Sequence, residues 1–176
     1  VDKSDFVLQS RLISGMVMIH LLSGNLSMAN DASRRLGVLA KDNQNVYIEA
    51  FAHCSMANVN LQSFNLDKAL QDFIFAKEHQ HILHIKFVIE SMVGECLTLQ
   101  LLGLPEKALN KLKHFLEYAR NTGDAQHIAV SESLQARLSL MQGNIHDAIQ
   151  WARSFNMEIP ALGMLYFQEI PSITIT

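Results

Sequence analysis

The chain has 176 residues, of which 49% are apolar and 18% charged, and its net charge is −3. This length suits one domain or two, with enough apolar residues for a large buried core. The small acidic excess argues against a nucleic-acid site in this segment, because such a site needs clustered Lys and Arg to replace phosphate counterions.

The N-terminal residues give no targeting signal. Residues 1–10 lack the basic start and apolar core of a signal peptide. The longest apolar run near the start, Met16–Ile19, ends at His20 and is far too short to cross a bilayer. We therefore expect a cytoplasmic protein with no membrane partner.

A helix-breaking triplet recurs four times along the chain, at a spacing of 39 or 40 residues, and an alanine follows five positions after the start of each. The triplets are Gly24-Asn25-Leu26, Phe64-Asn65-Leu66, Gly103-Leu104-Pro105 and Gly143-Asn144-Ile145, and the alanines are Ala29, Ala69, Ala108 and Ala148. A fixed period of this length predicts a solenoid of stacked helical pairs, which presents a long surface to a partner.

The second repeat shows the expected unit most clearly. A first helix is predicted over Val46–Gln62 and a second over Asp67–His79, because apolar residues recur at helical spacing in both. The triplet ends the first helix, and Asp67 begins the second, where an acidic side chain complements the helix dipole. In the third and fourth repeats Glu106 and His146-Asp147 lie at the start of the second helix.

A slender residue lies seven positions before each triplet. The four are Val17, Ala57, Cys96 and Ala136. Together with the alanine after the triplet, each predicts a close contact between the two helices of its pair. We therefore expect an all-α fold, a superhelical array of antiparallel helix pairs that forms a single domain over residues 1–176, cut from a larger protein.

Few residues carry reactive chemistry. Cys54 and Cys96 lie in no metal-ligand spacing, which predicts two small buried side chains in a reducing compartment. Three histidines, His79, His81 and His84, could ligate zinc or nickel, but no acidic or Cys partner has a matching spacing, so a solvated loop is favoured.

No catalytic or cofactor motif is present. The sequence has no phosphate-binding glycine-rich loop and no Gly-x-Ser-x-Gly elbow, and its carboxylates are spread through the predicted helices. We expect a protein that is not an enzyme and uses no cofactor. Glu95 is unusual, because it lies where the first helix of a repeat buries an apolar residue. It either faces solvent or pairs with a cation of the array.

Residues 156–171 depart from the repeat, since Pro160, Gly163 and Pro171 interrupt the helical pattern. We expect a strap that leads into the first helix of a truncated fifth repeat and packs against Trp151. Its apolar residues would form a face that promotes self-association. They are Ile159, Leu162, Met164, Leu165, Tyr166 and Phe167.

The slender residue, the turn glycine and the following alanine resemble the tetratricopeptide repeat, although the usual period there is about 34 residues. Over residues 133–176 the resemblance is to the helical-repeat region of MalT-like regulators, which are bacterial ATP-dependent activators with a LuxR-type DNA-binding end. It is carried by the stretches Gln135–Asn144, Ala148, Trp151–Ser154 and Phe167–Thr174. Phe64 in place of a turn glycine and Pro105 at a helix start depart from the pattern.

The resemblance implies a sensor or protein-interaction domain that receives a small effector or a partner protein, with ATPase and DNA-binding functions elsewhere. In tetratricopeptide arrays the first helix of each pair lines a concave groove. By offset from the triplets, the groove residues would be Arg11, Met18, Asn58, Gln62, Glu90, Gln100, Arg137 and Met141. The alternative is a stand-alone adaptor that binds a peptide of its partner, for which Arg11 and Arg137 are too few to form a basic carboxylate clamp.

Overall fold

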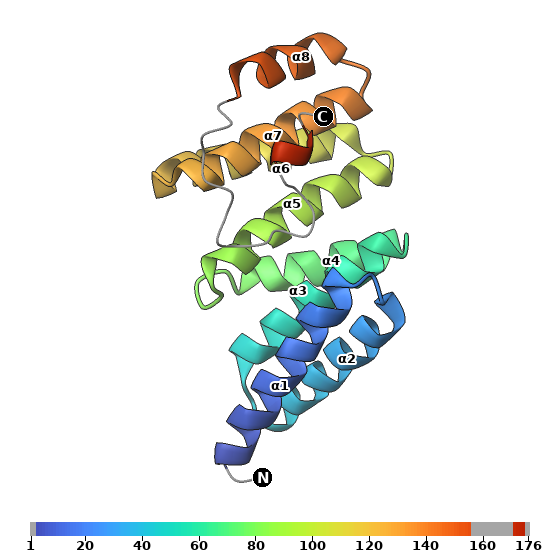
Figure 1. The fold of residues 1–176 in the computed structure, drawn as a ribbon, viewed down its shortest axis with the longest axis vertical. Helices are drawn as coiled ribbons and strands as arrows, with labels where there is room; N and C mark the ends of the chain where they lie inside the picture. The colour runs from blue at the N-terminus through green and yellow to red at the C-terminus, as the bar shows by residue number, and fades with distance from the viewer. Residues whose placement is uncertain (1–2, 156–170, 175–176) are drawn as a thin grey trace. The chain divides into compact units, whose positions relative to one another are not determined.

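The computed structural model describes residues 3–155 and 171–174, and all its regular elements there are helices (Figure 1). The helices are α1 (Lys3–Leu22), α2 (Leu26–Asp42), α3 (Val46–Gln62), α4 (Leu66–Glu78), α5 (Ile85–Leu101), α6 (Pro105–Thr122), α7 (Ala125–Met141), α8 (Ile145–Ser154) and α9 (Pro171–Thr174). The predicted all-α helical-repeat array is confirmed. The predicted helix over Val46–Gln62 is α3, and the helix expected from Asp67 begins one residue earlier, at Leu66.

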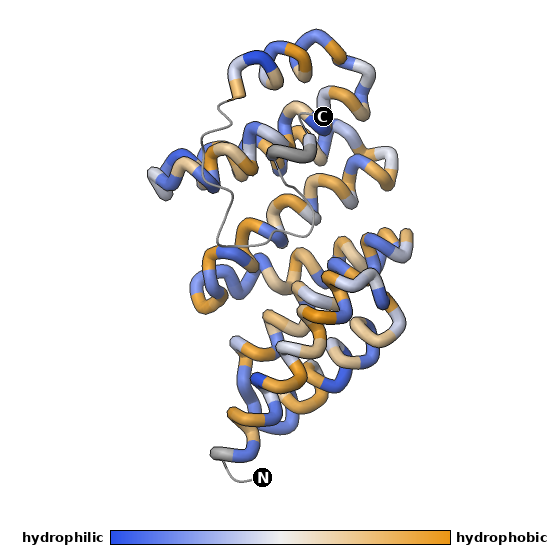
Figure 2. Tube along the Cα trace, viewed as in Figure 1, coloured by the Kyte–Doolittle hydropathy of each residue, from blue (hydrophilic) through white to orange (hydrophobic). Residues whose placement is uncertain are grey.

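The chain divides into two compact units, Val1–Gly94 and Glu95–Thr176, with the boundary inside α5. In the first unit α1 packs against α2, α2 against α3 and α3 against α4, and α1 also touches α3. In the second unit α7 packs against α6, α8 and α9. Along α2, α4, α6 and α8 hydrophobic and hydrophilic residues alternate (Figure 2), as expected for helices that bury one side, whereas α5 is buried on all sides over residues 88–99.

The small residues predicted to lie between the two helices of each pair are buried in all four repeats. Those before the triplets are Val17, Ala57, Cys96 and Ala136, and those after them are Ala29, Ala69, Ala108 and Ala148. None of the eight has more than a few per cent of its surface exposed. Short side chains at these positions let two helix axes approach closely, and the burial of all eight is what such a close approach requires.

The turn inside each helical pair has one conformation, which explains the repeated triplet. Its first residue adopts a left-handed backbone with φ of 70° at Gly24, 58° at Phe64, 72° at Gly103 and 82° at Gly143. The next N–H bonds back to the carbonyl five residues earlier, for example Asn25 N to His20 O at 2.9 Å. This is a Schellman motif, in which glycine avoids the steric cost that a Cβ meets at positive φ.

Phe64 is the exception, because it holds the left-handed conformation with a large side chain that is 71% exposed. A non-glycine residue in this conformation destabilises the folded state by roughly 1–2 kcal/mol. Glycine makes the unfolded chain more flexible, which lowers the free energy of unfolding by only about 0.5–1 kcal/mol. We predict that Phe64→Gly raises the free energy of unfolding by about 0.5–1 kcal/mol in urea denaturation. Gly24→Ala, whose new Cβ meets no neighbouring atom, should lower it by about 1 kcal/mol. Equal stability of Phe64→Gly and wild type would contradict a strained turn.

Gly94 on α5 lies directly beneath the ring of Phe73 on α4, and both residues are buried. A Cβ built at Gly94 would overlap the ring of Phe73. Glycine is therefore required here by the close approach of the ring, although it weakens a helix interior.

We predict that Gly94→Ala destabilises the protein by about 1–3 kcal/mol, because the buried ring of Phe73 must move. Gly15→Ala is the matched control, since nothing lies within 4 Å of its added Cβ, and it should be neutral or stabilising in thermal unfolding. Adding Phe73→Leu to Gly94→Ala should recover part of the loss. A neutral Gly94→Ala would show that the ring contact does not constrain α5.

Glu95 pairs with a cation, which decides between the two alternatives left open by the sequence. Its side chain is buried, and its Oε1 lies 2.6 Å from Nζ of the partly exposed Lys111 on α6. A buried carboxylate is costly unless it is paired in this way. The ion pair therefore links α5 to α6 within the second unit.

The predicted strap and a candidate membrane span concern the two ends of the chain. The strap over 156–168 and its apolar face, Ile159 to Phe167, lie outside the described residues.

Among the described residues one helix, α1, is long and apolar enough over Asp5–Leu22 to cross a membrane, judged by length and composition alone. A core helix or a signal sequence meets the same criterion, so the finding is weak evidence for a membrane span.

Candidate functional site

The first unit contains a groove of about 530 Å³ between α1, α3 and the start of α5. Its walls are mainly apolar, and among the described residues they include only one charged side chain, Arg11. The lining residues are Phe6, Val7, Ser10, Arg11, Ser14, Gly15, Met18, Asn45, Tyr47, Ile48, Phe51 and Phe87. Its volume falls within the range of pockets that hold small ligands or a few side chains of a peptide.

Aromatic residues form one wall of the groove. The rings of Phe51 and Phe87 meet edge to face, with centroids 4.6 Å apart, and Tyr47 is partly exposed one turn before Phe51. Asn45 caps α3, because its Oδ1 accepts a hydrogen bond from the N–H of Ile48 at 3.0 Å. The cap and the ring pair fix the start of α3, so this wall is preorganised for contact with an apolar group.

The opposite wall is α1, where polar groups are scattered between apolar ones. The hydroxyls of Ser10 and Ser14 donate to carbonyls of their own helix, at 3.0 and 2.7 Å. Arg11 is exposed, and among the described residues it has no ion pair or hydrogen bond from its side chain. Its guanidinium is therefore available to a carboxylate of a ligand.

Of the eight residues predicted to line a groove, Arg11 and Met18 do so. Asn58 and Glu90 are buried below it: Asn58 donates to the carbonyl of Cys54 at 2.9 Å, and Glu90 has about 1% of its surface exposed. These two are part of the core between α3 and α5, where a ligand in the groove would not contact them directly.

The other four predicted residues line none of the described pockets. Gln62 is exposed at the end of α3, and Met141 is exposed at the end of α7. In the second unit Gln100 accepts a hydrogen bond from Gln142 at 2.8 Å, and Arg137 is half-buried on α7. The structure thus brings together only the two predicted residues on α1.

The aromatic wall was missed by the sequence prediction, although a signal for it exists. Arg11 lies 13 positions before the first triplet (24 − 13), and the same offset gives Phe51 before the second (64 − 13) and Glu90 before the third (103 − 13). Phe51 is the groove residue, and Glu90 is not. A strict use of one offset would have found Phe51 but not Tyr47 or Phe87.

A buried polar layer lies between α3 and the first half of α5. It contains Cys54, Lys86, Glu90 and Ser91, and Ser91 Oγ donates to Cys54 Sγ at 3.6 Å. Burial raises the pKa of Cys54 to about 12, and the charge of Glu90 adds to this effect, while Ser91 and Lys86 oppose it. Burial also lowers the pKa of Lys86, against the charges of Glu90 and Cys54. Cys54 is therefore a protonated thiol at neutral pH and a poor nucleophile.

We predict that the raised pKa of Cys54 makes unfolding easier at high pH. The unfolded thiol ionises near its ordinary pKa of 9.0 and the folded one near 12, so the unfolded state binds fewer protons above pH 9. The free energy of unfolding should be unaffected by this group below pH 9 and fall by up to about 1.4 kcal/mol per pH unit above it. In urea denaturation, the free energy of unfolding of Cys54→Ala should fall less steeply above pH 9 than that of the wild type. Equal slopes would contradict the prediction.

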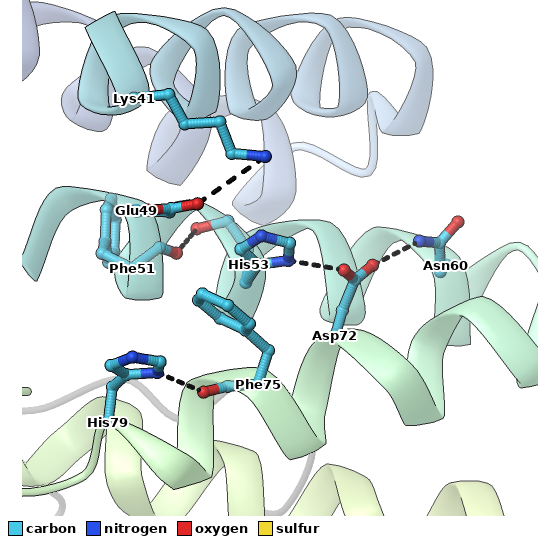
Figure 3. Close-up of polar contacts among 9 residues, drawn as sticks. Lys41, Glu49, Phe51, His53, Asn60, Asp72, Phe75 and His79 are labelled. Atoms are coloured by element: carbon cyan, nitrogen blue, oxygen red, sulfur yellow. Dashed lines mark hydrogen bonds and ion pairs between the residues drawn. The ribbon is translucent and has the colours of Figure 1, made fainter. Parts of the chain in front are cut away.

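A second pocket, of about 480 Å³, lies between α2, α3 and α4 and is mainly polar. Its wall includes Asp72, whose two carboxylate oxygens are both bonded (Figure 3). His53 Nδ1 donates to one at 2.7 Å and Asn60 Nδ2 to the other at 3.0 Å. The ring of Phe75 lies between those of His53 and His79, at 4.1 and 4.5 Å. These contacts join α3 to α4 and leave the Asp72 carboxylate little freedom.

The second unit has a pocket of about 520 Å³ between α7 and α8, lined by Glu132, Asp147 and Trp151 among others. The indole of Trp151 lies 5.1 Å from the ring of Phe155, and its buried Nε1 has no hydrogen-bond partner in the part of the chain that the structure describes. The predicted contact of Trp151 with the strap falls outside that part.

The three histidines of the α4–α5 loop do not come together. His79 Nδ1 donates to the carbonyl of Phe75 at 2.8 Å, and His84 Nδ1 accepts from the N–H of Lys86 at 3.3 Å. Within residues 3–155 and 171–174, no group of three His, Cys, Asp or Glu is placed to hold a metal ion.

Comparisons with protein-family models, curated proteins and solved structures found no match.

Proposed function

We propose that this chain is a non-catalytic interaction domain that binds an effector or a segment of a partner protein in the groove between α1, α3 and the start of α5. One observation carries the proposal: the groove is preformed and mainly apolar, and the single charged side chain among its described residues, Arg11, is exposed. Such a combination suits an apolar ligand that carries one acidic group.

The ligand would place its apolar part against Phe51, Phe87 and Tyr47 and its carboxylate near Arg11. A peptide with an acidic residue next to an aromatic or branched aliphatic one has both features. Two observations support a role in binding rather than catalysis. The buried thiol of Cys54 is protonated, and the hydroxyls of Ser10 and Ser14 in the groove bond carbonyls of their own helix.

We further propose that the domain is the sensor or protein-interaction segment of a MalT-like transcriptional regulator. The stretch Gln135–Asn144 and the following Ala148 and Trp151–Ser154 support this assignment. In such a regulator the ligand would act by binding one state of the protein better than another. A stand-alone adaptor is the alternative, and sequencing the gene on both sides distinguishes the two. A Walker-type loop upstream and a helix-turn-helix downstream are expected for the regulator.

Selection from a phage-displayed peptide library would test the groove. We expect the selected peptides to share an acidic residue near an apolar one, and Arg11→Glu to weaken their binding at least tenfold in isothermal titration calorimetry, because a like charge then faces the carboxylate. Tyr47→Ala should weaken it by a similar factor through lost apolar contact.

The control is Gln62→Ala, which changes an exposed residue on the same helix as Tyr47 that lines none of the described pockets. It should leave affinity unchanged. Peptides that bind Arg11→Glu and Gln62→Ala equally well, with wild-type affinity, would show that the groove is not the binding site.

A further inference from the structure

A continuous apolar stripe runs along the exposed side of α1 and borders the groove, which its central residue Gly15 also lines. Leu8, Leu12, Ile19 and Leu22 are all more than half exposed, with Leu12 at 60% and Ile19 at 64%. Together with Gly15 they follow the spacing i, i+4, i+7, i+11, i+14, so they share one face of the helix. The buried residues of α1, Ser10, Val17 and Leu21, lie on the opposite side.

At two central positions of the stripe the equivalent residues of every other repeat are buried, whereas the equivalents of Leu22, which are Gln62, Leu101 and Met141, are exposed. Leu12 lies twelve positions before its triplet, and the residues at this offset in the later repeats are Ala52, Ser91 and Ser131, all buried. Ile19 lies five positions before, and its equivalents Val59, Thr98 and Leu138 are also buried. For α3 the cover is α2, where Gly37 lies 3.8 Å from Ala52 Cβ. The repeat thus builds the middle of this face for contact with another helix, and among the four first helices α1 alone exposes large apolar side chains at both of these positions.

Gly15 adds a second property to the stripe. It corresponds to Gly94 of the third repeat, which the ring of Phe73 covers, yet nothing lies within 4 Å of a Cβ placed at Gly15. It also stands at the middle of the stripe, seven residues from both Leu8 and Leu22. A helix can therefore approach most closely at the centre of this face.

The apolar residues of the stripe are placed almost symmetrically on the two sides of Gly15. We therefore propose that the α1 stripe binds the α1 stripe of a second copy of the chain, with the two helices antiparallel. Around a pair of facing Gly15 residues, Leu8 lies opposite Leu22 of the second copy, and Leu12 lies within one residue of the position opposite Ile19. Every large apolar residue of the stripe then meets another. The register also separates the two Arg11 side chains, which are offset by eight positions, or about 12 Å along the helix.

A lipid bilayer fits this face less well than a second helix. Although α1 meets the length and composition of a membrane span, Val17 and Leu21 are buried against the rest of the first unit, so lipid could not surround the helix. The stripe extends over about 21 Å of helix from Leu8 to Leu22. A single helix pair of this length is at the low end of interface sizes, so we expect a dissociation constant in the micromolar range.

Sedimentation equilibrium of the full chain tests the proposal. The wild-type protein should dimerise in the micromolar range, and Leu12→Glu/Ile19→Glu should weaken the dimer at least tenfold, since the new carboxylate at position 12 then faces the one at position 19 of the second copy. Val38→Glu on α2 is the matched control, because Val38 is also 60% exposed and lies off the stripe. It should leave the equilibrium unchanged.

Two further variants test the register. Leu12→Glu/Ile19→Lys places opposite charges across an antiparallel pair but like charges across a parallel one, so it should dimerise more tightly than the double glutamate variant. Gly15→Cys should form a disulfide with its copy under mild oxidation, whereas Val38→Cys should not. The native thiols do not interfere, because Cys54 and Cys96 are both buried.

Three results would overturn the proposal. One is a wild-type chain that stays monomeric throughout the micromolar range. Another is a dimer that the double glutamate variant leaves intact, as contact through the C-terminal end would produce. The third is flotation of monomeric wild-type protein with phosphatidylcholine–phosphatidylglycerol vesicles that is lost in the double glutamate variant, which would assign the stripe to lipid. Circular dichroism of each variant checks that the helices are retained.

Discussion

The close approach of two helices at small side chains is the contact on which the rest of the structure depends. In each repeat one slender residue before the turn and one alanine after it are buried, and their role is to keep the space between the helices narrow. The hydrophobic gain at each contact is small, but the contact fixes how the helices of a pair lie together. Larger side chains elsewhere on the helices, such as Phe73 and Phe115, then fill the space that this geometry leaves.

The turn conformation follows from the same requirement. Two helices can be antiparallel and close only if the chain reverses within a few residues, and a left-handed residue at the helix end achieves this. Three repeats use glycine there, and the second repeat uses Phe64 with a similar left-handed φ and the same backward hydrogen bonds. The contact between the helices therefore determines the backbone of the turn even where the local residue opposes it.

Helices and turns were accessible from the sequence because both are local properties that recur with a measurable period. The helix over Val46–Gln62 was predicted to the residue, whereas the next helix begins one residue earlier than predicted, because Asn65 is its cap and Leu66 already belongs to it. The groove was only partly predictable. Arg11 and Met18 were found, but burial of Asn58 and Glu90 depends on how α3 and α5 pack, and the aromatic wall depends on Phe87 reaching Phe51 from 36 residues away. Neither is a local property.

The contact between Phe73 and Gly94 has a consequence for folding. A chain built of similar repeats can pair helices from the wrong repeats, and such mispaired states are typical traps for repeat proteins. At the positions equivalent to Phe73 the other repeats have Ser33, Leu112 and Ala152, and at those equivalent to Gly94 they have Gly15, Ser55 and Leu134. Leu134 leaves no room for a ring on α7. The contact therefore favours α5 over α7 as the neighbour of α4, and it penalises a shift by one residue, which would bring Val93 or Glu95 under the ring.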